Sequence, residues 1–227
     1  MQFRTSHTEV EAEFLFAALP ANAVVLDAGC GRRSRMGEYR DRIGRLVGVD
    51  LDAKAGAENL SVDQFVRADL GRRLPFEDGA FDLVYANFVV EHLEDPPTTF
   101  AEWRRILRHE GSLILLTSNV ANPYLAVARF LPKRVRSFLK HRGPGVAAQD
   151  VIPTHYRANR PDVLESLLAA AGFEAVAVAH VATLHRYAGE RPVLAELLRR
   201  AEEILPPRRR STIVGWYQPQ GGYPLIR

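Results

Sequence analysis

Short apolar runs alternate with helix-like segments along the first half of the chain, and this alternation limits the fold more than any other feature of the sequence. Five runs predict strands, at residues 24–27, 45–50, 65–69, 81–87 and 112–118. The last of them, "SLILLTS", is almost wholly apolar, which is typical of a parallel sheet that helices cover on both faces. The alternation of strand and helix predicts the α/β class.

The segments between and beyond these runs predict helices and a long insertion. Helices are expected from Ser6 to about residue 19, at 36–43 and from Thr98 to 110, with a short one behind Asp52. From residue 119 to 160 the alternation stops for too long to be a plain loop. We expect this segment to be a lid or acceptor-binding insertion in a single domain, 1–227. The alternation then resumes, with strands expected at 173–181 and 211–217 and helices at 159–173 and 192–204.

Composition excludes several classes of protein. The 227 residues carry a net charge of only +3, so no DNA partner is expected. Cys30 is the single cysteine, which rules out an internal disulfide and a cysteine-rich zinc site. The first residues lack the apolar core of a signal peptide, and no apolar run approaches the roughly 20 residues of a membrane-spanning helix. These features favour a cytoplasmic protein.

The segment "VVLDAGCG" places an acid and two glycines directly after the first expected strand. A strand followed by a glycine turn brings backbone N–H groups close to a ligand, and several cofactors use this arrangement. A dinucleotide site needs a third glycine at position 34, where this chain has Ser34. The Gly-Lys-Ser/Thr of a phosphate loop is also absent. Asp27 would repel a phosphate and would suit a cationic ligand such as an amino acid ammonium, which disfavours a nicotinamide oxidoreductase.

Two more acids stand where the next strands end. Asp50 ends the second run, and its carboxylate can accept both hydroxyls of a ribose. Asp69 ends the third run and can accept from an adenine amino group. Each also has a simpler interpretation, because Asp50 can cap the next helix and Asp69-Leu-Gly is an ordinary turn sequence. Together with Asp27, the acids fit S-adenosylmethionine better than a dinucleotide.

The segment from about residue 24 to 117 resembles the class I S-adenosylmethionine-dependent methyltransferases, within their small-molecule, type 11-like branch. The matching stretches are "VLDAGCG", "GVDLD", "RADL", "LPFEDGAFDLVYANFVVEHLEDP" and "EWRRILRHEGSLILLT", and later "HYRANRPDVLESLLAAAGF". The resemblance implies a Rossmann-like, mostly parallel seven-stranded sheet whose last strand runs antiparallel. It departs from the family at Arg33, where many members have a small residue.

The resemblance also implies which residues contact S-adenosylmethionine. They lie after four successive strands: Asp27, Gly29 and Gly31 at the methionine part, Asp50 at the ribose, Leu51, Asp69 and Leu70 at the adenine, and Asn87 and Phe88 near the sulfonium. Some relatives place a metal with Glu-x-x-Glu-His after the fourth strand. Phe88 replaces the first of those acids, so Glu91 and His92 leave too few ligands and no metal is expected.

Candidate catalytic residues are His155, Tyr156 and His92. His155 and Tyr156 stand where the insertion ends, so His155 is expected to take a hydroxyl proton and Tyr156 to orient the acceptor. The alternative is that both fix the insertion to the domain. His92 is either structural or part of the acceptor pocket.

The expected function is methyl transfer to a small-molecule acceptor, by family analogy a hydroxylated or saccharide compound. The alternative is a protein that binds S-adenosylmethionine without turnover, in a regulatory or structural role. The basic stretch 129–142 offers a contact for an anionic acceptor, a membrane surface or RNA, or is a solvated helix face. The sequence predicts no oligomeric state.

Overall fold

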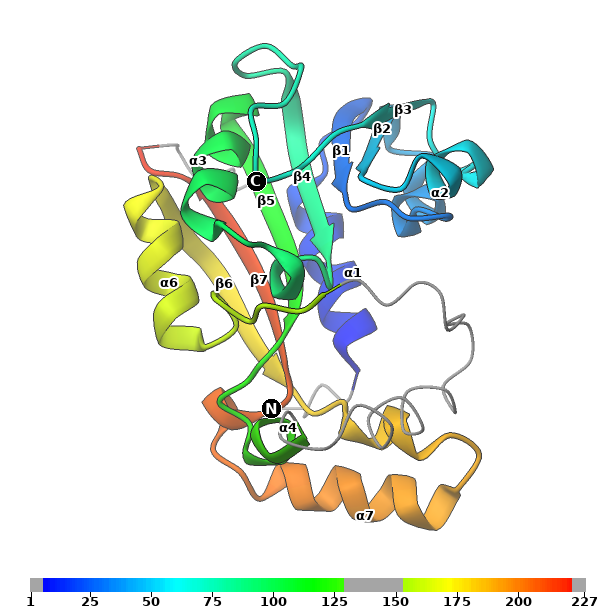
Figure 1. The fold of residues 1–227 in the computed structure, drawn as a ribbon, viewed down its shortest axis with the longest axis vertical. Coiled ribbons are helices and arrows are strands. Elements are labelled where there is room, and N and C mark those ends of the chain that lie inside the picture. The colour runs from blue at the N-terminus through cyan, green and yellow to red at the C-terminus, as the bar shows by residue number, and fades with distance from the viewer. Residues whose placement is uncertain (1–5, 129–152, 222–227) are drawn as a thin grey trace.

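The computed structural model describes residues 6–128 and 153–221, which form a seven-stranded sheet with the order β3-β2-β1-β4-β5-β7-β6 (Figure 1). The strands are β1 Ala23–Ala28, β2 Ile43–Asp50, β3 Gln64–Arg67, β4 Phe81–Asn87, β5 Leu107–Ser118, β6 Phe173–Val181 and β7 Thr212–Pro219. β1 to β5 pair in parallel, whereas β7 is antiparallel to both β5 and β6. The predicted Rossmann-like sheet and its antiparallel last strand are confirmed. The chain order reverses between β1 and β4, which is where ligands bind in such sheets.

Helices lie on both faces of the sheet and beyond the carboxyl ends of its parallel strands (Figure 1). They are α1 His7–Ala18, α2 Ala53–Glu58, α3 Pro96–Ile106, α4 Pro123–Ala128, α6 Pro161–Ala170 and α7 Pro192–Glu203. Single 3₁₀ turns occur at η1 Arg35–Tyr39, η2 Val90–His92, η3 Leu184–Ala188 and η4 Pro207–Arg209. Ser6 and Asp52 accept backbone N–H groups at the starts of α1 and α2, as the sequence predicted.

Two expected helices differ from the prediction. The helix expected at 36–43 is only the 3₁₀ turn η1, because β2 already begins at Ile43 and pairs there with Ala23. The helix expected from Thr98 begins earlier, at Pro96, because Asp95 caps it. It also ends at Ile106, where the chain enters β5 and pairs with Phe81.

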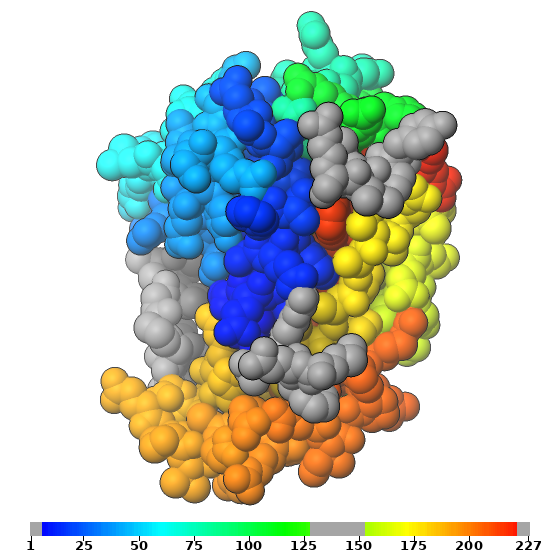
Figure 2. All heavy atoms as spheres, turned by 180° about the vertical axis from the view of Figure 1, so that it is seen from behind, coloured from blue at the N-terminus to red at the C-terminus, as the bar shows by residue number. Residues whose placement is uncertain are grey.

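The two faces of the sheet bury separate apolar cores. In Figure 1, α3 and α6 cover the face turned to the viewer and α1 lies behind; Figure 2 shows α1 in dark blue from the other side. Phe100 and Trp103 of α3 belong to the first core, and Phe14 and Leu15 of α1 to the second. Neighbouring strand residues alternate between the cores, since successive side chains of a strand point to opposite faces.

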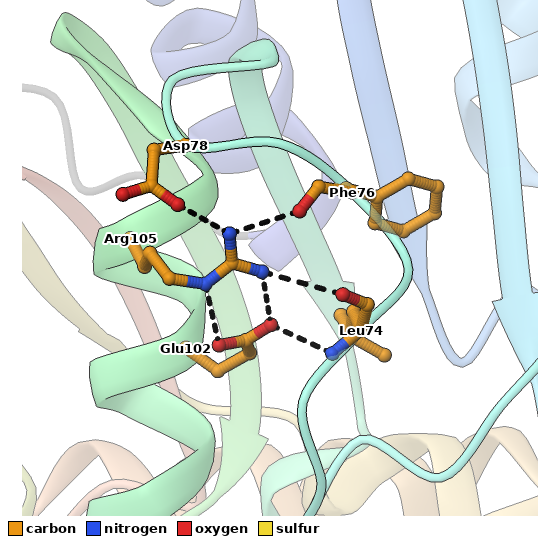
Figure 3. Close-up of polar contacts among 5 residues, drawn as sticks. All are labelled: Leu74, Phe76, Asp78, Glu102 and Arg105. Carbon is orange, nitrogen blue, oxygen red and sulfur yellow. Dashed lines mark hydrogen bonds and ion pairs between the residues drawn. The ribbon is translucent and has the colours of Figure 1, made fainter.

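The loop between β3 and β4 is held to α3 by one arginine (Figure 3). The Arg105 guanidinium donates to the carbonyl groups of Leu74 and Phe76, at 3.3 and 2.9 Å, and to the Asp78 carboxylate at 2.6 Å. Glu102 pairs with Arg105 and also accepts the Leu74 N–H at 2.7 Å. This network fixes the course of the chain just after Asp69 and Leu70, two of the predicted cofactor residues.

The segment after β5 is described only at its two ends. Residues 119–128 contain α4, and residues 153–160 lead into α6. The centre of the expected lid, with the basic stretch 129–142, lies outside the described residues. In Figure 1, α4 and α7 lie beyond the carboxyl ends of the parallel strands. Across the described ranges, no helix is both long and apolar enough to cross a membrane.

Candidate active site

The glycine turn after β1 is fastened to the end of β2. The N–H groups of Gly29 and Cys30 donate to the carbonyl oxygen of Val49, at 2.7 and 3.1 Å. The N–H of Gly31 donates to the Asp50 carboxylate at 2.9 Å. The structure therefore joins the predicted turn and the predicted ribose acceptor by a direct hydrogen bond.

Both glycines of the turn have a positive φ angle, but the space around their Cα atoms differs. Gly29 has a φ of +75°, and a Cβ there would lie 2.3 Å from Cγ2 of Val89. Gly29 is thus required both by its backbone conformation and by the close approach of the chain after β4. Gly31 has a φ of +53°, and a Cβ there would meet no atom within 4 Å. The space beside Gly31 is open, as a bound ligand would need.

Asp27 is a buried acid without a cationic partner in the described part of the chain. Its side chain is 3% exposed, at the end of β1. Burial raises the pKa of Asp27 to about 7, and the charges of Asp50 and Glu11 act in the same direction, against a hydrogen bond from Ser34. A buried carboxylate of this kind is stabilised in its charged form by a cation placed against it. The site therefore suits an ammonium group.

The acids after β2 and β3 differ in how much of their hydrogen-bonding capacity is used locally. Asp50 accepts one backbone N–H on each oxygen, from Gly31 and from Asp52, both at 2.9 Å. These two bonds orient the carboxylate and leave further lone pairs for a ligand. Asp69 accepts the N–H of Gly71 at 2.9 Å and lies 3.4 Å from the Arg72 guanidinium. The turn interpretation of Asp69 therefore holds locally, whatever else the residue binds.

The apolar residues predicted at the adenine have different exposures. Leu51 follows the end of β2 and is 59% exposed, so its side chain is available to a ligand. Leu70 is buried in the core that α3 covers. Arg33 is exposed and lines a hollow that includes none of the predicted cofactor residues.

The chain after β4 carries a strained residue at the predicted sulfonium position. Phe88 has a φ of +52°, which costs energy for a residue with a Cβ, and its N–H donates to the Leu116 carbonyl at 2.8 Å. Tyr156 has a φ of +54°. Apart from Asn22, these two are the non-glycine residues of the described chain with positive φ, and the sequence placed both in the site.

Glu91 organises the acceptor side. Its buried carboxylate accepts from the hydroxyl groups of Thr117 and Ser118, at 2.9 and 3.2 Å. Its carbonyl oxygen accepts the N–H groups of His155 and Tyr156, at 2.7 and 3.2 Å. Burial raises the pKa of Glu91 despite the Thr117 and Ser118 bonds. The chain therefore brings η2, the end of β5 and the candidate catalytic pair together through one residue, which the sequence analysis had weighed only as a metal ligand.

The two candidate histidines lie in different settings. His92 Nδ1 is 2.7 Å from the carbonyl oxygen of Pro153. A carbonyl can only accept, so Nδ1 carries the proton and Nε2 is left as an acceptor. His155 Nε2 lies 3.6 Å from the exposed carboxylate of Glu94. The backbone bonds of His155 and the bond of His92 to Pro153 agree with a role in fixing the end of the insertion.

Sequence reasoning missed a buried polar contact that positions α1. Glu11 of α1 is 1% exposed and accepts the hydroxyl of Tyr85 in β4, and it lies 3.2 Å from the Arg35 guanidinium. The sequence held a sign of this contact, because Glu11 falls on the same helical face as the buried Val10 and Phe14.

Cys30, between the two glycines of the turn, is buried. Burial raises the pKa of its thiol to about 12, which keeps the thiol protonated.

In the described chain, this edge carries no metal cluster, and one nearby hollow lies apart from the predicted cofactor residues. No group of three or more histidine, cysteine or acidic side chains there is arranged to hold a metal ion. A hollow between η1 and residues 60–63 is lined by Ser34, Glu38 and Asp63 among others, and includes none of the predicted cofactor residues.

Comparison with known proteins gives consistent matches. Residues 26–115 match the family model described as "Methyltransferase domain". A malonyl-[acyl-carrier protein] O-methyltransferase of Enterobacter lignolyticus is 34% identical over 119 residues, which are 49% of this chain and 47% of that protein. Nocamycin O-methyltransferase of Saccharothrix syringae is 30% identical over 175 residues, 69% of this chain and 61% of that protein. The chain spans about half the length of the first of these relatives.

The fold agrees with solved methyltransferase structures. Geranyl diphosphate C-methyltransferase of Streptomyces coelicolor A3(2), in complex with S-adenosyl-L-homocysteine, superposes with a TM-score of 0.64 at 18% identity, over 93% of this chain and 80% of that one. At this identity the likeness supports the fold alone. Together with the family match, this fold indicates S-adenosylmethionine as the cofactor. The chain belongs to the class I S-adenosylmethionine-dependent methyltransferases, in their type 11 branch.

Proposed function

We propose that this protein transfers a methyl group from S-adenosylmethionine to an oxygen of a small hydroxylated or saccharide acceptor. Two of the relatives compared above are named as O-methyltransferases, which supports transfer to oxygen. The observation that carries the proposal is the bond from Gly31 to Asp50, with Asp27 buried nearby. An oriented carboxylate, an open space and a buried acid without a cation match the ribose and the ammonium of one ligand.

The cofactor contacts follow from this geometry. Asp27 would hold the ammonium of the methionine part, and Asp50 would accept the ribose hydroxyls with the turn of Gly29 and Gly31 beside it. The exposed Leu51 side chain would be covered by the adenine, whose edge Asp69 and Leu70 would flank. Asn87 and Phe88 would line the site beside the sulfonium, where the strained backbone of Phe88 sets its direction. Each assignment is a proposal that a substitution can test.

The cofactor supplies an electrophilic methyl group on its sulfonium, and the chain's own residues must align an acceptor oxygen behind that group. A hydroxyl acceptor must also lose its proton to a base. His92 is suited to this task, since its bond to Pro153 leaves Nε2 as an acceptor. His155 is the competing candidate, and Tyr156 would orient the acceptor. We place the acceptor beside η2 and residues 153–160, the described end of the expected lid.

The deciding experiment is transfer of a labelled methyl group into fractionated extract, with identification of the labelled species. Label in a small hydroxylated compound supports the proposal, and label in a carrier protein would instead place the acceptor on an acyl carrier. Binding of S-adenosylhomocysteine without any transfer would favour the alternative, a protein that binds the cofactor without turnover.

Methyl transfer is expected to survive treatment with a chelator, because Phe88 replaces the first acid of the metal-binding pattern.

A further inference from the structure

A cationic side chain from the segment after β6 lies against the first helix, beside the residue that follows β4. The Arg186 guanidinium, on η3, donates to Nε2 of His7 at 2.7 Å. The ring of His7 meets the ring of Phe88 edge-on, with 6.4 Å between the centroids. Three elements that are far apart in the sequence thus converge next to the proposed sulfonium position.

The surroundings of His7 are positively charged. Burial, together with the charges of Arg186 and Arg35, lowers the pKa of His7 to about 4, so its ring is neutral near pH 7 and accepts the bond from Arg186. Arg35 is paired with Glu11 at 3.2 Å. Arg186 is exposed, and no acid within residues 6–128 or 153–221 forms an ion pair with it. Arg186 therefore brings a positive charge that the described chain does not balance.

The guanidinium has donors left for a ligand. His7 is contacted by Nη1 alone, and the Nη2 and Nε groups make no hydrogen bond to another described residue. Burial raises the pKa of the next residue, Tyr187, and the nearby Tyr156 and Glu91 of the acceptor side act in the same direction. Arg186 therefore lies near Phe88, through His7, and is next in sequence to a residue close to the acceptor side.

We propose that Arg186, oriented by His7, binds an anionic group of the acceptor, a carboxylate or a phosphate, while the oxygen to be methylated lies beside Phe88. The inference rests on the proposed methyl transfer and names the class of its substrate. A guanidinium recognises oxyanions through parallel N–H donors, which a carboxylate and a phosphate can both accept. The neutral ring of His7 fixes the guanidinium without neutralising it.

The test is a titration of protein saturated with S-adenosylhomocysteine, followed by the imidazole NMR signals of His7 at constant ionic strength. Inorganic phosphate and acetate are the anionic probes, and acetamide is the neutral counterpart of acetate. We expect saturable shifts with at least one anion and none with acetamide. Arg186→Gln should weaken anion binding at least about tenfold, the effect of one charged hydrogen bond, and Arg186→Lys should retain part of it. The control is Arg200→Gln, which removes the same charge from α7.

Three results would overturn the inference. They are no saturable shift with either anion, equal anion affinity in Arg186→Gln, and a loss of S-adenosylhomocysteine affinity in Arg186→Gln. The last would mean that Arg186 binds the carboxylate of the cofactor itself. If both anion and S-adenosylhomocysteine bind as expected but no methyl transfer occurs, the anion site stands and the proposed function fails. In an active extract fraction, Arg186→Gln should raise the KM for the acceptor and leave kcat nearly unchanged.

Discussion

The N–H of Gly31 donates to the carboxylate of Asp50 at 2.9 Å, across 19 residues of sequence. This bond makes the glycine turn and the acid after β2 one unit, because the acid fixes the turn and the turn aims the acid. The second oxygen of Asp50 accepts from Asp52 in the same way. A change at Asp50 should therefore affect ligand contacts and the shape of the turn together.

The first prediction concerns cofactor affinity. Asp50→Asn should weaken S-adenosylhomocysteine binding by about 10²-fold or more, since two charge-assisted hydrogen bonds to the ribose are lost at about 1.5–3 kcal/mol each. Calorimetric titration measures the affinity. The control is Asp52→Asn, which removes the same charge two residues away and keeps a good cap for α2. Equal affinities in the two folded variants would contradict the assignment of Asp50.

The second prediction concerns the stability of the ligand-free protein. The pKa of Asp27 is raised by burial to about 7 from an ordinary value of 3.8. Between these values the unfolded chain loses its proton while the folded protein keeps it, so this group lowers stability as the pH rises from about 4 to about 7. Above pH 7 its effect levels off. Urea midpoints across this range should fall less steeply in Asp27→Asn, and parallel profiles would show that Asp27 is not responsible.

The same acid makes a prediction about binding. An ammonium placed against Asp27 favours its ionised form, so cofactor binding should release a proton when the pH is below about 7. Calorimetry of S-adenosylhomocysteine binding in two buffers of different ionisation enthalpy counts the protons. The release should be present in the wild type near pH 6 and reduced in Asp27→Asn. Equal proton counts would remove Asp27 from the ammonium site.

The third prediction compares two glycines of the same turn. Gly29→Ala should destabilise the protein strongly, because it adds a clash with Val89 to the cost of a positive φ. Gly31→Ala meets no neighbouring atom, so it should cost only the backbone term, of about 1–3 kcal/mol. The added methyl group would project into the open space that the cofactor is proposed to occupy. Gly31→Ala should therefore reduce S-adenosylhomocysteine affinity although the protein still folds. A Gly31→Ala protein with full affinity would place the cofactor elsewhere.

The strands of the sheet could be predicted because the residues that indicate each strand lie close together in the sequence. The apolar runs, the glycine turn and the acids after Val49 and Ala68 appear within a few residues, and parallel pairing brings them to one edge. The contact of His7 with Arg186 spans 179 residues and leaves no local pattern. The 36–43 helix was wrong for a related reason, since pairing of Ile43 with Ala23 overrides a helical pattern.

The acceptor side could be predicted only in part. His92, His155 and Tyr156 were named from chain position, and the structure brings their backbones together at η2 through Glu91. The role of Glu91 itself was not apparent, because its partners Thr117 and Ser118 lie in β5, 26 and 27 residues further along the chain. A polar residue in an apolar stretch signals a buried contact but does not name the partner.

The last prediction concerns the general base. His92→Gln keeps an N–H donor for the Pro153 carbonyl but cannot take a proton, so it separates a catalytic role from a structural one. If His92 is the base, His92→Gln should keep S-adenosylhomocysteine affinity and lose turnover by about 10²–10⁴-fold. His155→Gln should remain active, because the backbone bond of residue 155 to Glu91 persists and its ring faces Glu94 at the surface. The reverse pattern would assign the base to His155, as the sequence alone suggested. Normal turnover in both variants would mean that neither histidine removes a proton and that the acceptor oxygen reacts already ionised.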